Sequence, residues 1–229
     1  GTPLIGVRMN SGVDCVSARN LHIFGTSGEG FYSAPVTNSC TFDGIRVVGA
    51  LANQSRSEIA GGTEIHGSDH WISNIESGCG QTALSPNFDM STPLFTCGTW
   101  IDSASDANVS KVSGEAADIG LYTTGSAATY SQCYPNFVFA HGWVDNSGNY
   151  TQMVNCKSFN NGRAAADTYD SFYRLSTGGA INVSEFCAYV PGGTNAMRYA
   201  INDQGVDSGS NAIRARYAGV RAVGTFTRT

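Results

Sequence analysis

The stretch Ser105–Tyr122, SDANVSKVSGEAADIGLY, holds two apolar residues three apart, Val109 and Val112, just after an asparagine and just before a glycine. The same spacing returns along the chain at intervals of 21 to 44 residues, a range typical of repeat architectures. The pairs are Leu21/Phe24, Phe42/Ile45, Ile72/Ile75, Val109/Val112, Met153/Cys156 and Val183/Phe186, with a weaker one at Ile213. Because each unit is too small to bury its own apolar face, the units are expected to stack into an elongated solenoid.

Composition indicates that these units are built from strands. The 229 residues include 28 glycines, only 14 % of them are charged, and the only lysines are Lys111 and Lys157. Such a chain does not suit a helical bundle and favours many short strands joined by turns. The Leu-x-x-Leu-x-Leu signature of leucine-rich repeats and the regular Trp-Asp pairs of propellers are missing. The sequence therefore predicts an all-β fold, a parallel β-helix in which like residues stack in register.

Two further expectations follow from the repeat. Asn20, Asn108 and Asn182 each precede an anchor and are placed in an asparagine ladder at a turn, with ordinary turn asparagines as the alternative. The two longest intervals, from Ile72 to Val109 and from Val109 to Met153, are expected to hold loops or extra strands that project from the wall.

Charge and cysteine content limit the partners. The net charge of −5 and the shortage of lysine argue against nucleic-acid binding, which needs a concentrated basic surface. Seven cysteines with no Cys-x-x-Cys pair are interpreted as free thiols in the core, which implies folding in a reducing compartment. No signal peptide or membrane-spanning segment is visible, so membrane insertion is not expected. The sequence points to no cofactor and no metal.

Three stretches carry a resemblance to a known family. They are ARNLHIFGTSGEGFY from Ala18, SDANVSKVSGEAADIGLY from Ser105 and AINVSEFCAYVPGG from Ala180. These coils resemble right-handed parallel β-helix proteins of the pectin-lyase-like superfamily, and most of all bacteriophage tailspikes and capsule depolymerases. The resemblance covers residues 13–217 and lies in texture rather than in a diagnostic motif. It implies a homotrimer that binds, and in many members cleaves, bacterial surface polysaccharide.

We therefore expect one right-handed parallel β-helix domain over residues 1–229 with loop insertions, compatible with a piece of a longer tailspike-like chain. Its expected location is the virion tail, acting at the bacterial surface after assembly in the host cytoplasm. The family has no fixed catalytic motif, so the site residues below are inferred from this chain alone.

Glycoside hydrolysis needs two carboxylates across a groove, and neighbouring coils supply them about 4.8 Å apart per coil. Glu76, Glu115 and Asp118 follow neighbouring anchors closely and are expected to share one face, with Asp145 in the next insertion. These four are the candidate catalytic residues, although in a chain with 18 carboxylates some fall near aromatic residues by chance. The aromatic and polar residues nearby, candidates for sugar binding, are Trp100, Tyr122, His141 and Trp143.

A second cluster lies in TEIHGSDHW, which contains Glu64, His66, Asp69 and His70 before Trp71. Glu64 and His66 are expected to point to one side of a strand because strand side chains alternate. The cluster suits substrate binding, or acid and base roles in a polysaccharide lyase. The plainer interpretation is a polar turn before a buried tryptophan.

The sequence thus favours a tailspike-like protein that binds and cleaves bacterial surface polysaccharide, as hydrolase or lyase. The alternative is a non-catalytic structural or adhesive β-helix module of a tail fibre or surface protein. A cellular pectin-lyase-like enzyme is a third interpretation, and the absence of a disulfide pattern weighs against it.

Overall fold

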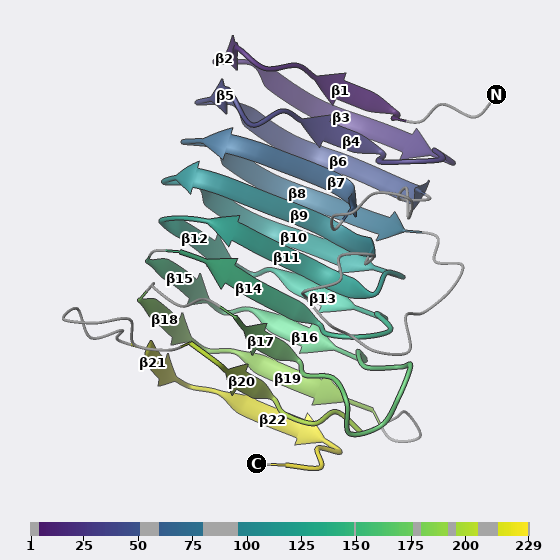
Figure 1. The fold of residues 1–229 in the computed structure, drawn as a ribbon, viewed down its shortest axis with the longest axis vertical. Helices are drawn as coiled ribbons and strands as arrows, with labels where there is room; N and C mark the ends of the chain where they lie inside the picture. Colours follow the sequence, from purple (N-terminus) through teal and green to yellow (C-terminus); the bar gives the residue numbers. More distant parts are fainter. Residues whose placement is uncertain are drawn as a thin grey trace.

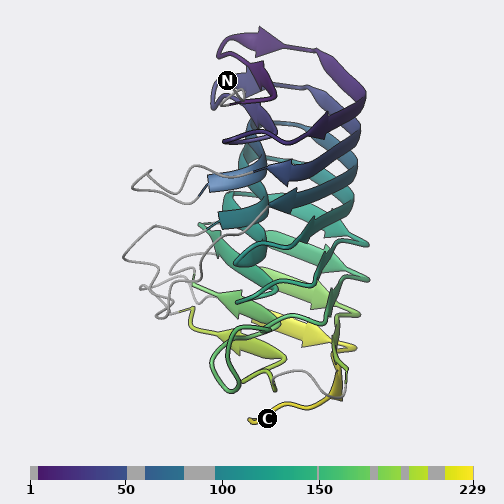
Figure 2. The same cartoon turned by 90° about the vertical axis from the view of Figure 1, so that its right-hand side faces the viewer.

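The chain is all-β, with two sheets of parallel strands and no helix among the residues that the structure describes. The computed structural model describes residues 5–50, 60–79, 96–148, 150–175, 180–191, 196–205 and 215–228. Figure 1 shows the strands lying across the long axis, one below another, from the N-terminal to the C-terminal end. Figure 2, turned by 90°, shows the sheets curling around a common interior.

The first sheet has ten strands, ordered β1-β4-β7-β9-β11-β14-β17-β20 with β2 and β5 beside this path. They are β1 (Val7–Met9), β2 (Val13–Asp14), β4 (Phe31–Ser33), β5 (Thr37–Asn38), β7 (Ala60–Ser68), β9 (Thr96–Ser105), β11 (Ile119–Gly125), β14 (Trp143–Ser147), β17 (Phe172–Arg174) and β20 (Ile201–Asp203).

The second sheet has twelve strands, in the order along the chain β3, β6, β8, β10, then the pairs β12/β13, β15/β16, β18/β19 and β21/β22. They are β3 (Ser17–Phe24), β6 (Thr41–Ala50), β8 (Trp71–Cys79), β10 (Asn108–Glu115), β12 (Ala128–Ser131), β13 (Tyr134–Asn136), β15 (Thr151–Val154), β16 (Lys157–Phe159), β18 (Ile181–Ser184), β19 (Cys187–Val190), β21 (Ala215–Ala218) and β22 (Arg221–Gly224).

The chain alternates between the two sheets, and each return places it beside the strand laid down one passage earlier. We call one passage through both sheets a rung. Every named pair of strands is parallel, so equivalent residues of successive rungs lie side by side. The anchors of the second sheet form two such lines in the core. The first runs through Phe42, Ile72, Val109, Tyr130, Met153 and Val183, and the second through Ile45, Ile75, Val112, Cys133, Cys156 and Phe186.

A left-handed residue explains why the anchors stand three apart. In a straight strand residues three apart face opposite sides. Between each pair of anchors one residue has a positive φ, which turns the chain so that both anchors face the interior. These corner residues, in successive rungs, are Asn20, Gly44, Asn74, Lys111, Gln132, Asn155, Glu185 and Gly219, with φ from 52° to 66°. Glycine and asparagine adopt this region most readily, which accounts for their recurrence.

The structure corrects three details of the predicted repeat. In the first rung the anchors are Ala18 and Leu21, since these pair with Phe42 and Ile45, while Phe24 faces outward and is 64 % exposed. The 44-residue interval before Met153 contains a complete extra rung, whose first anchor is the buried Tyr130. The sequence pattern missed it because its anchors are a tyrosine and a cysteine.

The asparagine ladder is the third correction. Asn20 occupies a corner, whereas Asn108 and Asn182 lie in strands, three rungs apart in the same register line. Ile213 and the segment 80–95, which includes most of the first expected insertion, lie outside the described residues.

A line of glycines sets the spacing between the sheets. Gly6, Gly30, Gly62, Gly98, Gly120 and Gly142 stand at equivalent positions of successive rungs, just at or before the strands of the first sheet. A Cβ atom on Gly98 would lie 2.5 Å from the Cα of Gly114 in the second sheet, and one on Gly120 would lie 2.3 Å from the Cβ of Pro135. Only glycine fits at these positions because the sheets approach each other so closely there.

Candidate functional site

The outer face of the first sheet carries an in-register row of large side chains. Tyr32, Glu64, Trp100, Tyr122 and Tyr173 occupy this row on β4, β7, β9, β11 and β17, with Val144 of β14 between the last two. Two residues further along the strands, on the same face, a second row holds His66, Asp102, Thr124 and Asn146. As predicted, Glu64 and His66 point to the same side of β7, because strand side chains alternate.

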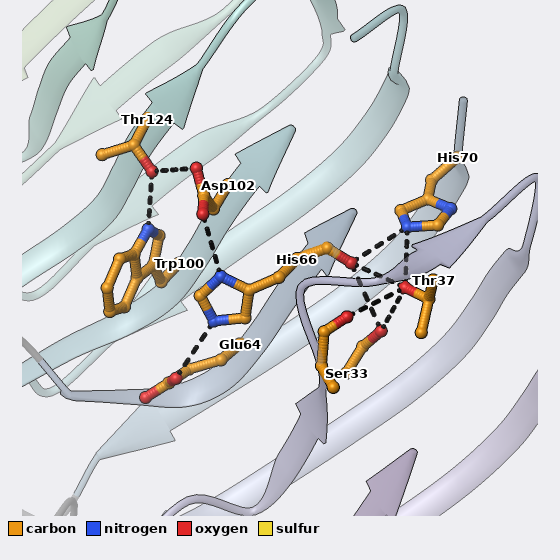
Figure 3. A network of polar contacts seen from close by, with 9 residues as sticks. Ser33, Thr37, Glu64, His66, His70, Trp100, Asp102 and Thr124 are labelled. Atoms are coloured by element: carbon orange, nitrogen blue, oxygen red, sulfur yellow. Dashed lines mark hydrogen bonds and ion pairs between the residues drawn. The ribbon is translucent and has the colours of Figure 1, made fainter. Parts of the chain in front are cut away.

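His66 lies between two carboxylates (Figure 3). Its Nδ1 is 3.1 Å from Oδ2 of Asp102, and its Nε2 is 3.3 Å from Oε2 of Glu64. The other oxygen of Glu64, Oε1, accepts a hydrogen bond of 2.7 Å from the backbone N–H of Gly61. A protonated imidazole donates through both nitrogens, so this arrangement suits the imidazolium.

The two carboxylates keep His66 charged. Burial alone would lower the pKa of His66, but the hydrogen bonds to Asp102 and Glu64 and the charges of both carboxylates raise it to about 9. In turn, the hydrogen bond from His66 lowers the pKa of Asp102. At neutral pH His66 is therefore a cation and Asp102 an ionised carboxylate.

Thr124 connects Asp102 to the tryptophan beside it. Its hydroxyl donates a hydrogen bond of 2.8 Å to Oδ1 of Asp102 and accepts one of 2.9 Å from Nε1 of Trp100. The Trp100 ring also packs edge-on against His66 at 4.9 Å and Tyr122 at 5.5 Å between ring centroids. These contacts fix the orientation of both the carboxylate and the indole.

Exposure separates the ligand-facing groups from their support. The side chain of Asp102 is 36 % exposed, whereas those of His66 and Glu64 are 7 % and 2 % exposed. Trp100 and Thr124 are half-buried. We call Trp100, Asp102 and Thr124 the Asp102 site. It offers an ionised acceptor and an aromatic surface side by side, which suits a ligand with both hydroxyl groups and apolar C–H faces.

The other histidine of this segment is a structural group. His70 Nε2 donates to the backbone oxygen of His66 at 3.0 Å, and Nδ1 accepts from the backbone N–H of Cys40 at 3.2 Å. Burial lowers the pKa of His70, and this bonding fits the neutral ring. Asp69 is an exposed corner residue with φ 57°, away from the Asp102 site, and Trp71 is 64 % exposed rather than buried.

His141 lies further along the first sheet, in a separate cluster. It stacks on Tyr173 at 4.8 Å, and its Nδ1 accepts from the backbone N–H of Asp170 at 3.1 Å. Burial lowers the pKa of His141 to about 4. Asp170 is fully buried and accepts two hydrogen bonds from Arg198, of 3.1 and 2.7 Å.

Trp143 and Asp145 face the interior. Trp143 is fully buried against Tyr130 and Phe172. Asp145 is 1 % exposed and accepts hydrogen bonds from Thr123 and Ser147, while burial raises its pKa. Both side chains are therefore part of the core in this structure.

The three remaining candidate carboxylates do not come together. Glu76 and Glu115 line one groove on the outside of the second sheet, where Glu76 pairs with Arg46 at 3.3 Å and Glu115 accepts from Asn136 at 3.4 Å. Asp118 is 2 % exposed and accepts hydrogen bonds from the backbone N–H and the hydroxyl of Thr96.

Sequence reasoning brought Glu64, His66, Trp100 and Tyr122 into the candidate set but did not find Asp102 or Thr124. The signal that would have found them is the glycine line. Aligning GTEIHG from Gly62, GTWIDS from Gly98 and GLYTTG from Gly120 places His66, Asp102 and Thr124 at the same offset.

Comparisons with known protein families, with curated proteins and with solved structures found no match. Within the described ranges, no three histidine, cysteine or acidic side chains gather as metal ligands. The same residues contain no helix of the length and apolarity needed to span a membrane.

Proposed function

We propose that this protein is a tailspike-like right-handed parallel β-helix that binds bacterial surface polysaccharide on the outer face of its first sheet, at the Asp102 site. The observation that carries the proposal is the pairing of an ionised, partly exposed Asp102 with the half-buried Trp100, held together through Thr124. Repeated alternation between two parallel sheets supports the β-helix, because parallel neighbours need a crossover at every step. A homotrimer and a place on the virion tail belong to the same proposal.

The site would bind a sugar through two kinds of contact. The lone pairs of Asp102 that protein groups leave open accept sugar hydroxyl protons, and charge makes such hydrogen bonds strong. The Trp100 ring packs against the C–H face of the sugar ring. His66 and Glu64 do not face the ligand; they hold Asp102 in place and keep it ionised.

Binding to a panel of bacterial capsular and O-antigen polysaccharides tests the proposal. Asp102→Asn and Trp100→Ala should each weaken binding of the recognised glycan about tenfold or more, in line with the loss of one charged hydrogen bond or one stacked ring. Asp106→Asn is the matched control, because Asp106 is an exposed corner carboxylate with φ 45° that asparagine tolerates. Binding that survives both site variants unchanged, or no binding across the panel, would refute the proposal.

Cleavage is the second candidate function, and one observation favours it. An ionised carboxylate stands beside a protonated imidazole at the Asp102 site, so an acceptor and a donor of protons lie in contact. Release of new reducing ends from the bound glycan, without absorbance of unsaturated uronates, would identify a hydrolase. Reducing ends together with that absorbance would identify a lyase. Binding with neither product would leave the adhesive module as the function.

The carboxylate variants locate the chemistry. If the reaction takes place at the Asp102 site, Asp102→Asn abolishes product formation while Glu76→Gln and Glu115→Gln preserve it. The opposite pattern would move the reaction to the groove of the second sheet. The mass of the native particle by light scattering tests the trimer.

A further inference from the structure

The outer face of the second sheet carries a strip without charged side chains. Before the corner line, the outward residues of β8, β10, β12, β15 and β18 alternate with buried anchors. They are Trp71 and Ser73, Asn108 and Ser110, Thr129 and Ser131, Gln152 and Val154, and Asn182 and Ser184. We call this surface the neutral strip. In register, Trp71, Asn108, Thr129, Gln152 and Asn182 follow one another along it.

Trp71 stands at one end of a groove in this strip. The groove is lined by the indole and by Ser73, Asn108, Ser110, Thr129 and Ser131. Trp71 is 64 % exposed, whereas Trp143 is buried and Trp100 is half-buried. The neutral strip thus pairs an exposed aromatic ring with a floor of hydroxyl and amide groups.

The chemistry of the strip selects one class of ligand. Amide and hydroxyl side chains both donate and accept hydrogen bonds, so they match sugar hydroxyls without requiring a charge. The register repeats one such group about every 4.8 Å, which suits a polymer that lies along the long axis. A polyanion would need basic side chains, and this strip offers none between Trp71 and Ser184.

We propose that the neutral strip is a second binding site, for an uncharged polysaccharide chain that stacks a sugar ring on Trp71 and continues over Asn108, Thr129, Gln152 and Asn182. It rests on the proposed function only in taking the ligand to be a glycan. It lies on a different sheet from the Asp102 site and uses none of its residues.

The test compares Trp71→Ala and Thr129→Val with Phe24→Ala in binding to a panel of neutral and uronate-containing bacterial polysaccharides. Phe24 is a matched control because it is also 64 % exposed and lies on β3, outside the neutral strip. We expect Trp71→Ala to weaken binding of at least one neutral glycan about tenfold, and Thr129→Val about threefold. We expect Phe24→Ala to leave that affinity unchanged.

Fluorescence gives a readout that does not depend on affinity. The chain has three tryptophans, and the exposed Trp71 should dominate the emission that acrylamide quenches. The bound neutral glycan should protect wild-type emission from quenching, and this protection should vanish in Trp71→Ala. The inference is overturned if no neutral glycan depends on Trp71, or if Trp71 is shielded only by association between copies of the chain.

The two proposals fail in different ways. Loss of binding in Asp102→Asn and Trp100→Ala, with Trp71→Ala unaffected, refutes the neutral strip alone. The reverse pattern refutes the Asp102 site alone. Absence of binding to any glycan refutes both.

Discussion

His66 is held from both edges of its ring by carboxylates, so its proton contributes to folding as well as to the site. A histidine in an unfolded chain has a pKa near 6.5, and folding raises that of His66 to about 9. The stabilisation is therefore complete below pH 6.5 and is lost as pH rises through 9.

We predict that His66→Gln removes this part of the pH dependence. Between pH 6.5 and 9.5 the free energy of unfolding of the wild type should fall relative to that of the variant by about 1–3 kcal/mol. Urea unfolding of both proteins across this range measures the difference, and titration of tyrosine, lysine and cysteine side chains cancels between them. Parallel curves would show that His66 is not protonated in the folded protein.

Residue-level prediction succeeded where the signal is local. Glu64 and His66 lie two apart on one strand, and alternation alone places them together. Asp102 and Thr124 join them from β9 and β11, 36 and 58 residues further along the chain than His66. Their position depends on inter-strand register, which the anchors of the second sheet did not supply. Asp145 and Trp143 look like site residues in sequence, but register turns them into the core.

At the scale of elements, the glycine line and the corner line restrict which residues each rung accepts. Gly120 sits where β11 passes the second sheet, and a Cβ there would meet Pro135 Cβ at 2.3 Å and the backbone oxygen of Gly142 at 2.8 Å. Neither neighbour is the free end of a flexible side chain, so backbone must move.

We predict that Gly120→Ala lowers the free energy of unfolding by about 3 kcal/mol or more, the range of overpacked cores. Gly148→Ala is the control, since the nearest heavy atom to its Cβ is 3.7 Å away. Denaturant midpoints measure both. An equal, small effect in the two variants would mean that the sheets do not approach closely at Gly120.

The corner line gives a prediction of opposite sign. Lys111 has φ 53°, a conformation that costs a residue with a side chain about 1 kcal/mol and glycine almost nothing. Lys111→Gly should therefore stabilise the protein by about 0.5–1 kcal/mol, while Lys111→Val should destabilise it by 1–2 kcal/mol, roughly. Thermal melts of the three proteins give the order, and valine matching glycine would contradict a left-handed corner.

The elements were predictable as far as their anchors were apolar. Pairs such as Ile72/Ile75 and Val109/Val112 lie in the core as expected, because only aliphatic residues fill that position without a polar group. The rung anchored by Tyr130 and Cys133 was not recognised, since neither residue reads as an aliphatic anchor. The first-sheet repeat went unnoticed because its constant residue is a glycine, fixed by close approach rather than by hydrophobicity.

At the scale of the whole molecule, stability should vary along the long axis. Central strands such as β11 are mostly buried, while β22 at the C-terminal end is exposed at every position. In a stack of repeats each rung is stabilised by its two neighbours, and an end rung has one.

We predict that amide hydrogens of β10 and β11 exchange at least roughly tenfold more slowly than those of β21 and β22. Hydrogen exchange with mass spectrometry of peptides from these strands measures the gradient. Equal protection along the chain would mean that the last rung is covered in solution.

The shortest rungs have a consequence for how this gene can change. Gly98, Gly120 and Gly142 follow one another at 22 residues, and the corners Asp106, Lys111 and Ala116 are repeated at Ala127, Gln132 and Phe137, each 21 residues later. A rung is thus a unit of inheritance: an in-frame duplication or loss of one such segment would lengthen or shorten the protein while every remaining side chain keeps its register. Recombination could graft the outward residues of one lineage onto the interior of another.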